Sequence, residues 1–69
     1  MLVYVNREKL TNMRRDMNLS QRQLSLMSGL PGNAVNRMET EDNRVSSLRL
    51  SVVAATVGCE LTNLIRTQK

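Results

Sequence analysis

The stretch LSQRQLSLMSGLPGNAVNRME, residues 19–39, decides the fold of this 69-residue chain. Two short apolar segments flank the break SGLPG, and each is too short to form a stable helix alone. Ser20 can cap a helix, and the glutamine three residues later completes a capping box, so a helix is predicted to begin at Ser20. Gly29 is placed to end that helix, and Pro31 to begin the next one, over about residues 31–39. The sequence therefore predicts two short helices joined by a turn.

Similar signals divide the rest of the chain into three further helices. Their expected bounds are about residues 6–17 after the cap Asn6, from Ser46 or Ser47 to Gly58, and from Glu60 or Thr62 onward. The apolar start MLVYV either covers the core or pairs as a short strand across a dimer. The chain is expected to be a compact all-α domain of five helices, with residues 1–5 as an N-terminal extension and residues 67–69 as a frayed tail.

Composition argues against several classes of protein. The chain has no His and a single Cys, so we expect neither a metal site nor an internal disulfide. No acid, base or nucleophile can be assigned a catalytic role, so we expect no enzyme and no cofactor. No segment approaches the roughly 18 consecutive apolar residues of a membrane span, and the start does not resemble a secretory signal. These features predict a cytoplasmic protein with no membrane partner.

Positive charge is concentrated in the two ends of the sequence. Ten Lys and Arg residues oppose six Asp and Glu residues, which gives a net charge of +4. Residues 1–25 carry five basic residues against two acidic ones, and residues 44–69 carry four against one, whereas residues 26–43 carry one against three. A positive surface favours polyanionic partners. An anion-binding face would therefore draw its charge from both ends of the chain.

The segment MRRDMNLSQRQLSLMSGL, residues 13–30, resembles the lambda-repressor-like helix-turn-helix family, which includes phage repressors, Cro proteins and small bacterial regulators. The shared features are an Arg before a Leu-Ser-Gln triplet, a small residue in the next helix and a glycine at the turn. They are Arg14, Leu19, Ser20, Gln21, Ser25 and Gly29. The match covers about residues 6–66. It implies a five-helix DNA-binding domain whose second and third helices form the helix-turn-helix unit.

The resemblance also implies which residues contact DNA. The second helix of such a unit enters the major groove, where Asn and Arg can pair with adenine and guanine, while Gly only permits close backbone approach. The base-reading positions would be Gly32, Asn33, Asn36 and Arg37. The DNA backbone would be contacted by Ser20, Gln21, Asn43, Arg44 and Arg14. Simpler roles are also open, because Ser20 is explained as a cap, and the Asn residues and Arg44 as solvated side chains.

Relatives pair an Arg at the position of Arg14 with a Glu that ends the recognition helix, here Glu39, and this ion pair would fix the angle between helices. Relatives also commonly dimerise through their last helix, and the N-terminal segment is the alternative surface. The candidate interface residues are Leu61, Leu64, Ile65, Val3 and Tyr4. A homodimer would match a palindromic operator.

The sequence thus predicts a sequence-specific transcriptional regulator that binds double-stranded DNA, similar to a Cro protein or repressor and of the size found in phages and mobile elements. Two features depart from the family pattern. Pro31-Gly32 replaces the usual polar start of the recognition helix, and the acidic segment at residues 40–42 weakens phosphate attraction. The alternative is an antirepressor-type interaction module that binds a repressor protein instead of DNA.

Overall fold

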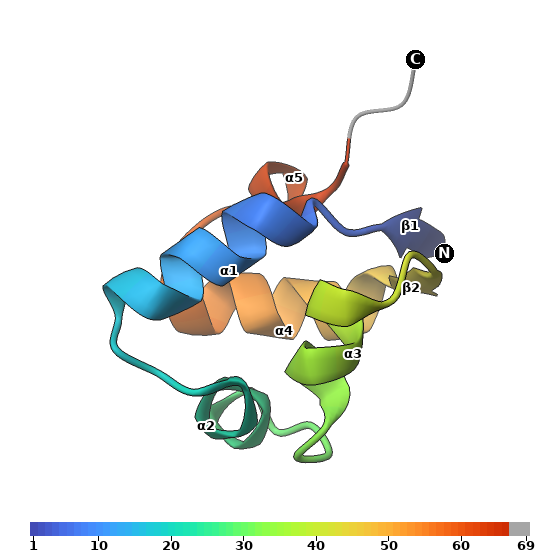
Figure 1. Ribbon diagram of the computed structural model, residues 1–69. Helices are drawn as coiled ribbons and strands as arrows, with labels where there is room; N and C mark the ends of the chain where they lie inside the picture. The colour runs from blue at the N-terminus through green and yellow to red at the C-terminus, as the bar shows by residue number, and fades with distance from the viewer. Residues whose placement is uncertain (67–69) are drawn as a thin grey trace.

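The computed structural model describes residues 1–66, which form five helices and a small sheet. The elements are β1 (Leu2–Tyr4), α1 (Arg7–Asp16), α2 (Gln21–Met27), α3 (Ala34–Thr40), β2 (Arg44–Ser46), α4 (Ser47–Val57) and α5 (Leu61–Leu64). In Figure 1, α1 runs above α4, α3 crosses in front of α4, and α2 lies below them. The two strands lie at one end beside the N-terminus. The frayed tail expected at residues 67–69 lies outside the described residues.

The expected all-α fold is wrong. Residues 1–66 are 59% helical and 12% strand, because β1 pairs with β2 in an antiparallel sheet. Val3 lies opposite Val45, and an isolated bridge between Val5 and Ile65 adds the C-terminal segment on the other edge of β1. β-Branched and aromatic residues favour such pairing, and burial of the sheet's inner face stabilises it. Residues 1–5 are therefore integrated into the domain, and they pair within one chain.

Three helices end in the same hydrogen-bonded motif, each with a left-handed residue after the last turn. These residues are Asn18, Gly29 and Gly58, with φ values of 58°, 76° and 82°. After α2, the Gly29 N–H donates to the Leu26 carbonyl at 3.0 Å and the Leu30 N–H to the Ser25 carbonyl at 2.9 Å. This crossed pair satisfies carbonyls that a helix end leaves free. The predicted helix stops at Gly29 and Gly58 follow from it.

The starts of α1 and α2 are capped as predicted, but α3 starts late. Ser20 and Gln23 form a complete capping box, with distances of 3.0 and 2.7 Å. α3 begins at Ala34, three residues after the expected start at Pro31. The reason is a separate turn, closed by a 3.0 Å bond from the Ala34 N–H to the Pro31 carbonyl. Gly favours such a turn over a helix interior.

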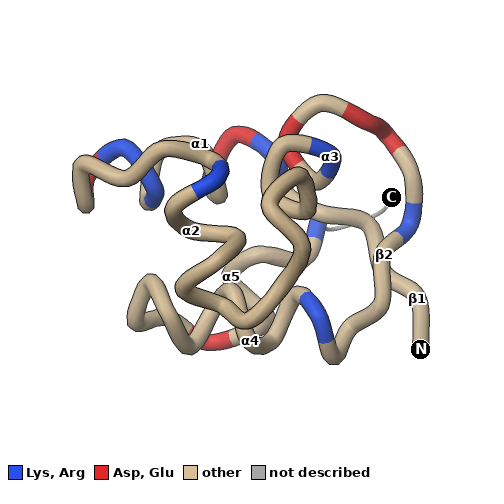
Figure 2. Tube along the Cα trace, turned by 90° about the horizontal axis from the view of Figure 1, so that it is seen from below, with Lys and Arg blue, Asp and Glu red and all other residues tan. Residues whose placement is uncertain are grey.

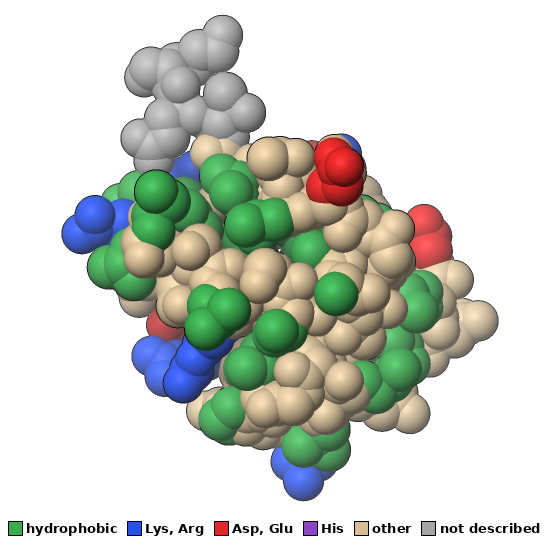
Figure 3. Space-filling model, turned by 180° about the vertical axis from the view of Figure 1, so that it is seen from behind, with side chains coloured by type: hydrophobic (Ala, Val, Ile, Leu, Met, Phe, Trp, Pro, Cys, Tyr) green, Lys and Arg blue, Asp and Glu red, His purple; other side chains and the backbone are tan. Residues whose placement is uncertain are grey.

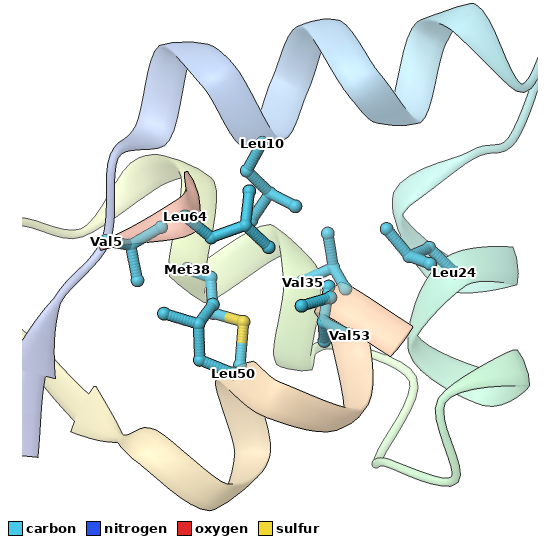
Figure 4. Close-up of a cluster of buried hydrophobic side chains, with 9 residues drawn as sticks. Val5, Leu10, Leu24, Val35, Met38, Leu50, Val53 and Leu64 are labelled. Carbon is cyan, nitrogen blue, oxygen red and sulfur yellow. The ribbon is translucent and has the colours of Figure 1, made fainter. Parts of the chain in front are cut away.

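The hydrophobic core lies between all five helices, where side chains from distant segments converge (Figure 4). Its fully buried members are Leu10, Leu24, Val35, Leu50, Val53 and Leu64, with Val5, Met38 and Ala54 almost as buried. α2 and α3 contribute Leu24, Val35 and Met38, so the two short helices are held by the same core as the longer ones. Burial of this apolar surface compensates for their low intrinsic stability.

Candidate nucleic-acid interface

A buried serine joins α2 to α3. The Ser25 Oγ accepts a hydrogen bond from the Val35 N–H at 2.8 Å and donates to the Gln21 carbonyl at 2.8 Å. Val35 is the second residue of α3, and its amide would otherwise have no partner within its own helix. Asn33 precedes α3 but makes no side-chain cap, so Ser25 caps α3 from the neighbouring helix. This contact fixes where α3 begins relative to α2.

The ion pair expected between Arg14 and Glu39 is present and connects α1 to α3. The Arg14 Nε and Nη2 donate to the two Glu39 carboxylate oxygens at 2.7 and 3.1 Å, and the Nη1 donates to the Leu19 carbonyl at 2.8 Å. The side chains are only 11% and 4% exposed, respectively. The guanidinium of Arg14 is thus occupied inside the protein. Its contact with Leu19 also ties down the connection that leads into α2.

The same carboxylate continues a chain of hydrogen bonds toward the surface. The Gln21 Nε2 donates to Glu39 at 3.0 Å, and the Gln21 Oε1 accepts a bond from the Asn36 Nδ2 at 2.8 Å. Gln21 is the first residue of α2, and Asn36 lies on the exposed side of α3. One hydrogen of the Asn36 amide and its oxygen remain available to a ligand. The chain from Arg14 to Asn36 therefore orients a surface amide from the interior.

Glu39 is ionised at neutral pH in this setting. Burial by itself favours the neutral acid, but hydrogen bonds from Arg14 and Gln21 outweigh burial and hold the pKa of Glu39 below its ordinary value. A charged carboxylate with charge-assisted hydrogen bonds is a stronger anchor than a neutral one. The charge of Glu39 thus stabilises the arrangement of three helices.

The outer side of α3 carries polar side chains with no role in the core. Asn33, Asn36 and Arg37 are exposed, whereas Ala34, Val35 and Met38 face inward. Arg37 contacts Glu41 one turn later at 3.3 Å, and these side chains are 63% and 42% exposed. Such an exposed pair contributes little stability, so Arg37 can exchange Glu41 for another partner at small cost.

The residues expected to hold the DNA backbone lie on both sides of α3. Ser20 and Gln21 are at the N-terminus of α2, although the Ser20 side chain is used in its capping box. On the other flank, the Asn43 Nδ2 donates to Glu41 at 3.3 Å, and Arg44 is an exposed residue of β2 opposite Tyr4. The pairing of β2 with β1 holds the backbone of Arg44 in place.

A pocket of about 310 Å³ lies between α3, β2 and the start of α4. Three arginines from these elements line it: Arg37, Arg44 and Arg49. Arg49, in the first turn of α4, was not singled out from the sequence. The sequence did carry a signal for Arg49. A cation in the first turn of a helix is destabilised by the helix dipole, so its presence there indicates a role other than stability. Figure 2 shows basic residues on several elements and acidic ones in the connection from α3 to β2.

Not all of the residues expected on a dimer surface are accessible in the folded chain. Leu64 is fully buried within the chain, so its side chain is not available to a partner. Leu61 and Ile65 are half-buried against the core, and Val3 and Tyr4 belong to β1, where the Arg66 guanidinium lies 4.4 Å from the Tyr4 ring centroid.

The most exposed large hydrophobic residues are Met1, Leu48, Met27, Leu2 and Leu26. On the α4 side, hydrophobic groups are interspersed with polar atoms and charges lie near the margin (Figure 3).

Comparisons with family models, curated proteins and solved structures found no match to this chain. The resemblance to the lambda-repressor-like family therefore stays a prediction from the residues quoted above. Among residues 1–66, no helix has both the length and the apolar character that crossing a membrane requires.

Proposed function

We propose that this chain is a sequence-specific regulator that binds double-stranded DNA through α3. The observation that carries the proposal is that α3 is held from three directions while Asn33, Asn36 and Arg37 on its outer side remain exposed. Ser25 caps its start, Glu39 anchors its last turn to Arg14, and Val35 packs in the core. A short helix fixed in this way can present side chains to the major groove with little entropic cost on binding.

Two kinds of contact follow from the geometry. Asn33, Asn36 and Arg37 would read base edges, because Asn forms bidentate pairs with adenine and Arg with guanine. Gln21 on one flank and Arg44 on the other would contact phosphates and set the register of α3 in the groove. Arg49 lines the same pocket as Arg44 and would add a further positive charge there.

The proposed DNA site is palindromic and bound by a homodimer, with half-sites about one helical turn apart, roughly 34 Å. A regulator of this kind acts in the cytoplasm. Because Leu64 is buried, Leu61, Ile65 and the exposed residues of the N-terminal segment remain as the surface for self-association. A dimer doubles the contacts with DNA, which compensates for the modest positive charge of one protomer.

One observation favours the antirepressor-type alternative. Glu41 and Asp42 follow α3 directly, and both already pair with arginines of the same chain, Arg37 and Arg66. Carboxylates at this edge repel phosphates and attract a basic protein surface. A repressor partner that presents Lys or Arg would fit there.

Selection of bound sequences from random duplex DNA separates the two functions. The full chain is incubated with a random library, and the bound fraction is amplified over several rounds. Enrichment of a palindrome with two conserved half-sites supports the DNA-binding regulator. Recovery of unenriched sequences at every salt concentration tested contradicts it and leaves the interaction module as the better account.

A further inference from the structure

Gly32 stands at a position where the backbone does not require glycine. Only Gly29 and Gly58 among the glycines have positive φ, so other residues could adopt the conformation of Gly32. What glycine provides here is space. A Cβ added to Gly32 would lie 2.6 Å from Nη1, 3.3 Å from Cζ and 3.6 Å from Cγ of Arg22. The Arg22 side chain therefore lies where the side chain of any other residue at position 32 would begin.

Arg22 has no partner within the part of the chain that the structure describes. Residues 1–66 form three ion pairs, and Arg22 belongs to none of them and to no side-chain hydrogen bond. It is the second residue of α2, whose N-terminus carries partial positive charge and favours acidic residues. Arg22 thus breaks a local preference without a compensating contact, which is the pattern expected of a functional residue.

The place of Arg22 suits recognition of a planar acceptor. Its guanidinium has five N–H donors in a fixed fork. The guanidinium lies beside Gly32 while the side chain is exposed, so its donors are accessible to a ligand. Gly32 immediately precedes Asn33, and the turn that contains it leads directly into α3. The charge is therefore held beside the first exposed side chains of the surface proposed to read DNA.

We infer that Arg22 supplies the first base-reading side chain of this surface, in the space that Gly32 leaves open, and that its ligand is a guanine edge in the major groove. This inference rests on the proposed function. Guanine offers O6 and N7 acceptors at a spacing that matches the arginine fork. Arg22 of α2 thus supplies the long polar side chain that Gly32 lacks just before α3.

Two substitutions remove the contact in different ways. Arg22→Met keeps the apolar stem and removes the guanidinium, whereas Gly32→Ala keeps the charge but displaces it, because the new Cβ overlaps the flexible end of Arg22. Gly32→Ala should leave the thermal midpoint unchanged or raised, since the backbone there is compatible with alanine. Arg15→Met is the matched control, because Arg15 is exposed on α1 and forms no ion pair within residues 1–66.

Each variant is titrated on the selected operator and on duplexes in which every base pair is replaced in turn. In both Arg22→Met and Gly32→Ala, the preference for the same G·C pair in each half-site is expected to fall by about 5- to 150-fold. Preferences at the other positions, and the whole profile of Arg15→Met, should stay as in the wild type. An unchanged profile in Arg22→Met overturns the assignment. So does an equal loss on all duplexes, which would make Arg22 a phosphate contact.

The wild-type profile distinguishes this failure from failure of the proposed function. If the wild type prefers its operator over scrambled duplex and only the Arg22→Met profile is unchanged, the role of Arg22 alone is overturned. If the wild type shows no preference for any duplex, the proposed function fails and the role of Arg22 fails with it. Melting curves of all variants verify that the compared proteins are folded.

Discussion

Arg14 and Glu39 lie 25 positions apart in the sequence, yet the Nε of Arg14 donates to the Oε2 of Glu39 at 2.7 Å. Removing one partner leaves a buried charge without compensation, so Arg14→Met or Glu39→Leu alone should cost about 3 kcal/mol of unfolding free energy. The double substitution should recover part of this loss, with a coupling energy of at least about 1 kcal/mol. Urea unfolding of the four proteins measures the cycle.

The exposed pair Arg37–Glu41 provides the control cycle, because its side chains are 63% and 42% exposed. Its coupling energy should be below about 0.5 kcal/mol. Additive losses in the Arg14–Glu39 cycle, or equal coupling in the two cycles, would contradict the view that the buried pair fixes α1 against α3.

Ser25 should be more important for stability than its size indicates. Ser25→Ala leaves the buried Val35 amide without an acceptor, which should cost about 1 to 3 kcal/mol. Ser51→Ala is the control, because the Ser51 hydroxyl bonds only to a carbonyl of its own helix, and it should cost much less. Chemical denaturation provides the comparison. Equal costs for the two substitutions would exclude a special role for Ser25 in capping α3.

The ionisation of Glu39 makes stability depend on pH in a predictable direction. Its pKa is lowered in the folded protein from an ordinary value near 4.5. A carboxyl group with a lowered pKa stabilises the folded protein at pH values above its ordinary pKa. This contribution is lost as the pH falls through the folded-state pKa. The wild type should therefore exceed Glu39→Gln in unfolding free energy by a nearly constant amount between about pH 6 and pH 7, which is about 1.5 to 2.5 units above the ordinary pKa. The excess should shrink below that range, and an excess that grows on acidification would refute the assignment.

The helix positions could be predicted from the sequence because their signals are local. The Ser20 capping box needs only four adjacent residues, and the stop at Gly29 needs only the left-handed conformation that glycine adopts readily. The pairing of Arg14 with Glu39 came from the family resemblance, since residues so far apart carry no local sign of contact.

The parts that could not be predicted depend on contacts between distant segments. β1 has three residues and pairs with a strand 40 to 44 positions away, so neither segment carries a clear strand signal alone. The dimer surface at Leu64 was expected from the family resemblance, and a four-residue helix does not define its buried side from sequence spacing alone. The contact of Arg22 with Gly32 depends on the angle between α2 and α3, which only the folded structure gives.

Phosphate contacts and base contacts should differ in their response to salt and sequence. Arg44→Ala should weaken binding to specific and non-specific duplexes alike, and should reduce the slope of log affinity against log salt by about 0.9. Asn36→Ala should instead relax preference at one base pair by about 1 to 3 kcal/mol and leave the salt slope nearly unchanged. Binding titrations at several salt concentrations separate the two effects. Identical behaviour of the two variants would contradict the assignment of separate roles.

The central claim, that the outer side of α3 reads DNA sequence, is tested most directly by one ratio of affinities. The ratio compares the selected operator with a scrambled duplex of the same composition at a fixed salt concentration. We expect the wild type to prefer the operator by about 10³-fold or more. Alanine at Asn33, Asn36 and Arg37 together should bring the ratio close to one while the protein remains folded. A wild-type ratio near one, or a ratio that survives the triple substitution, would contradict the claim.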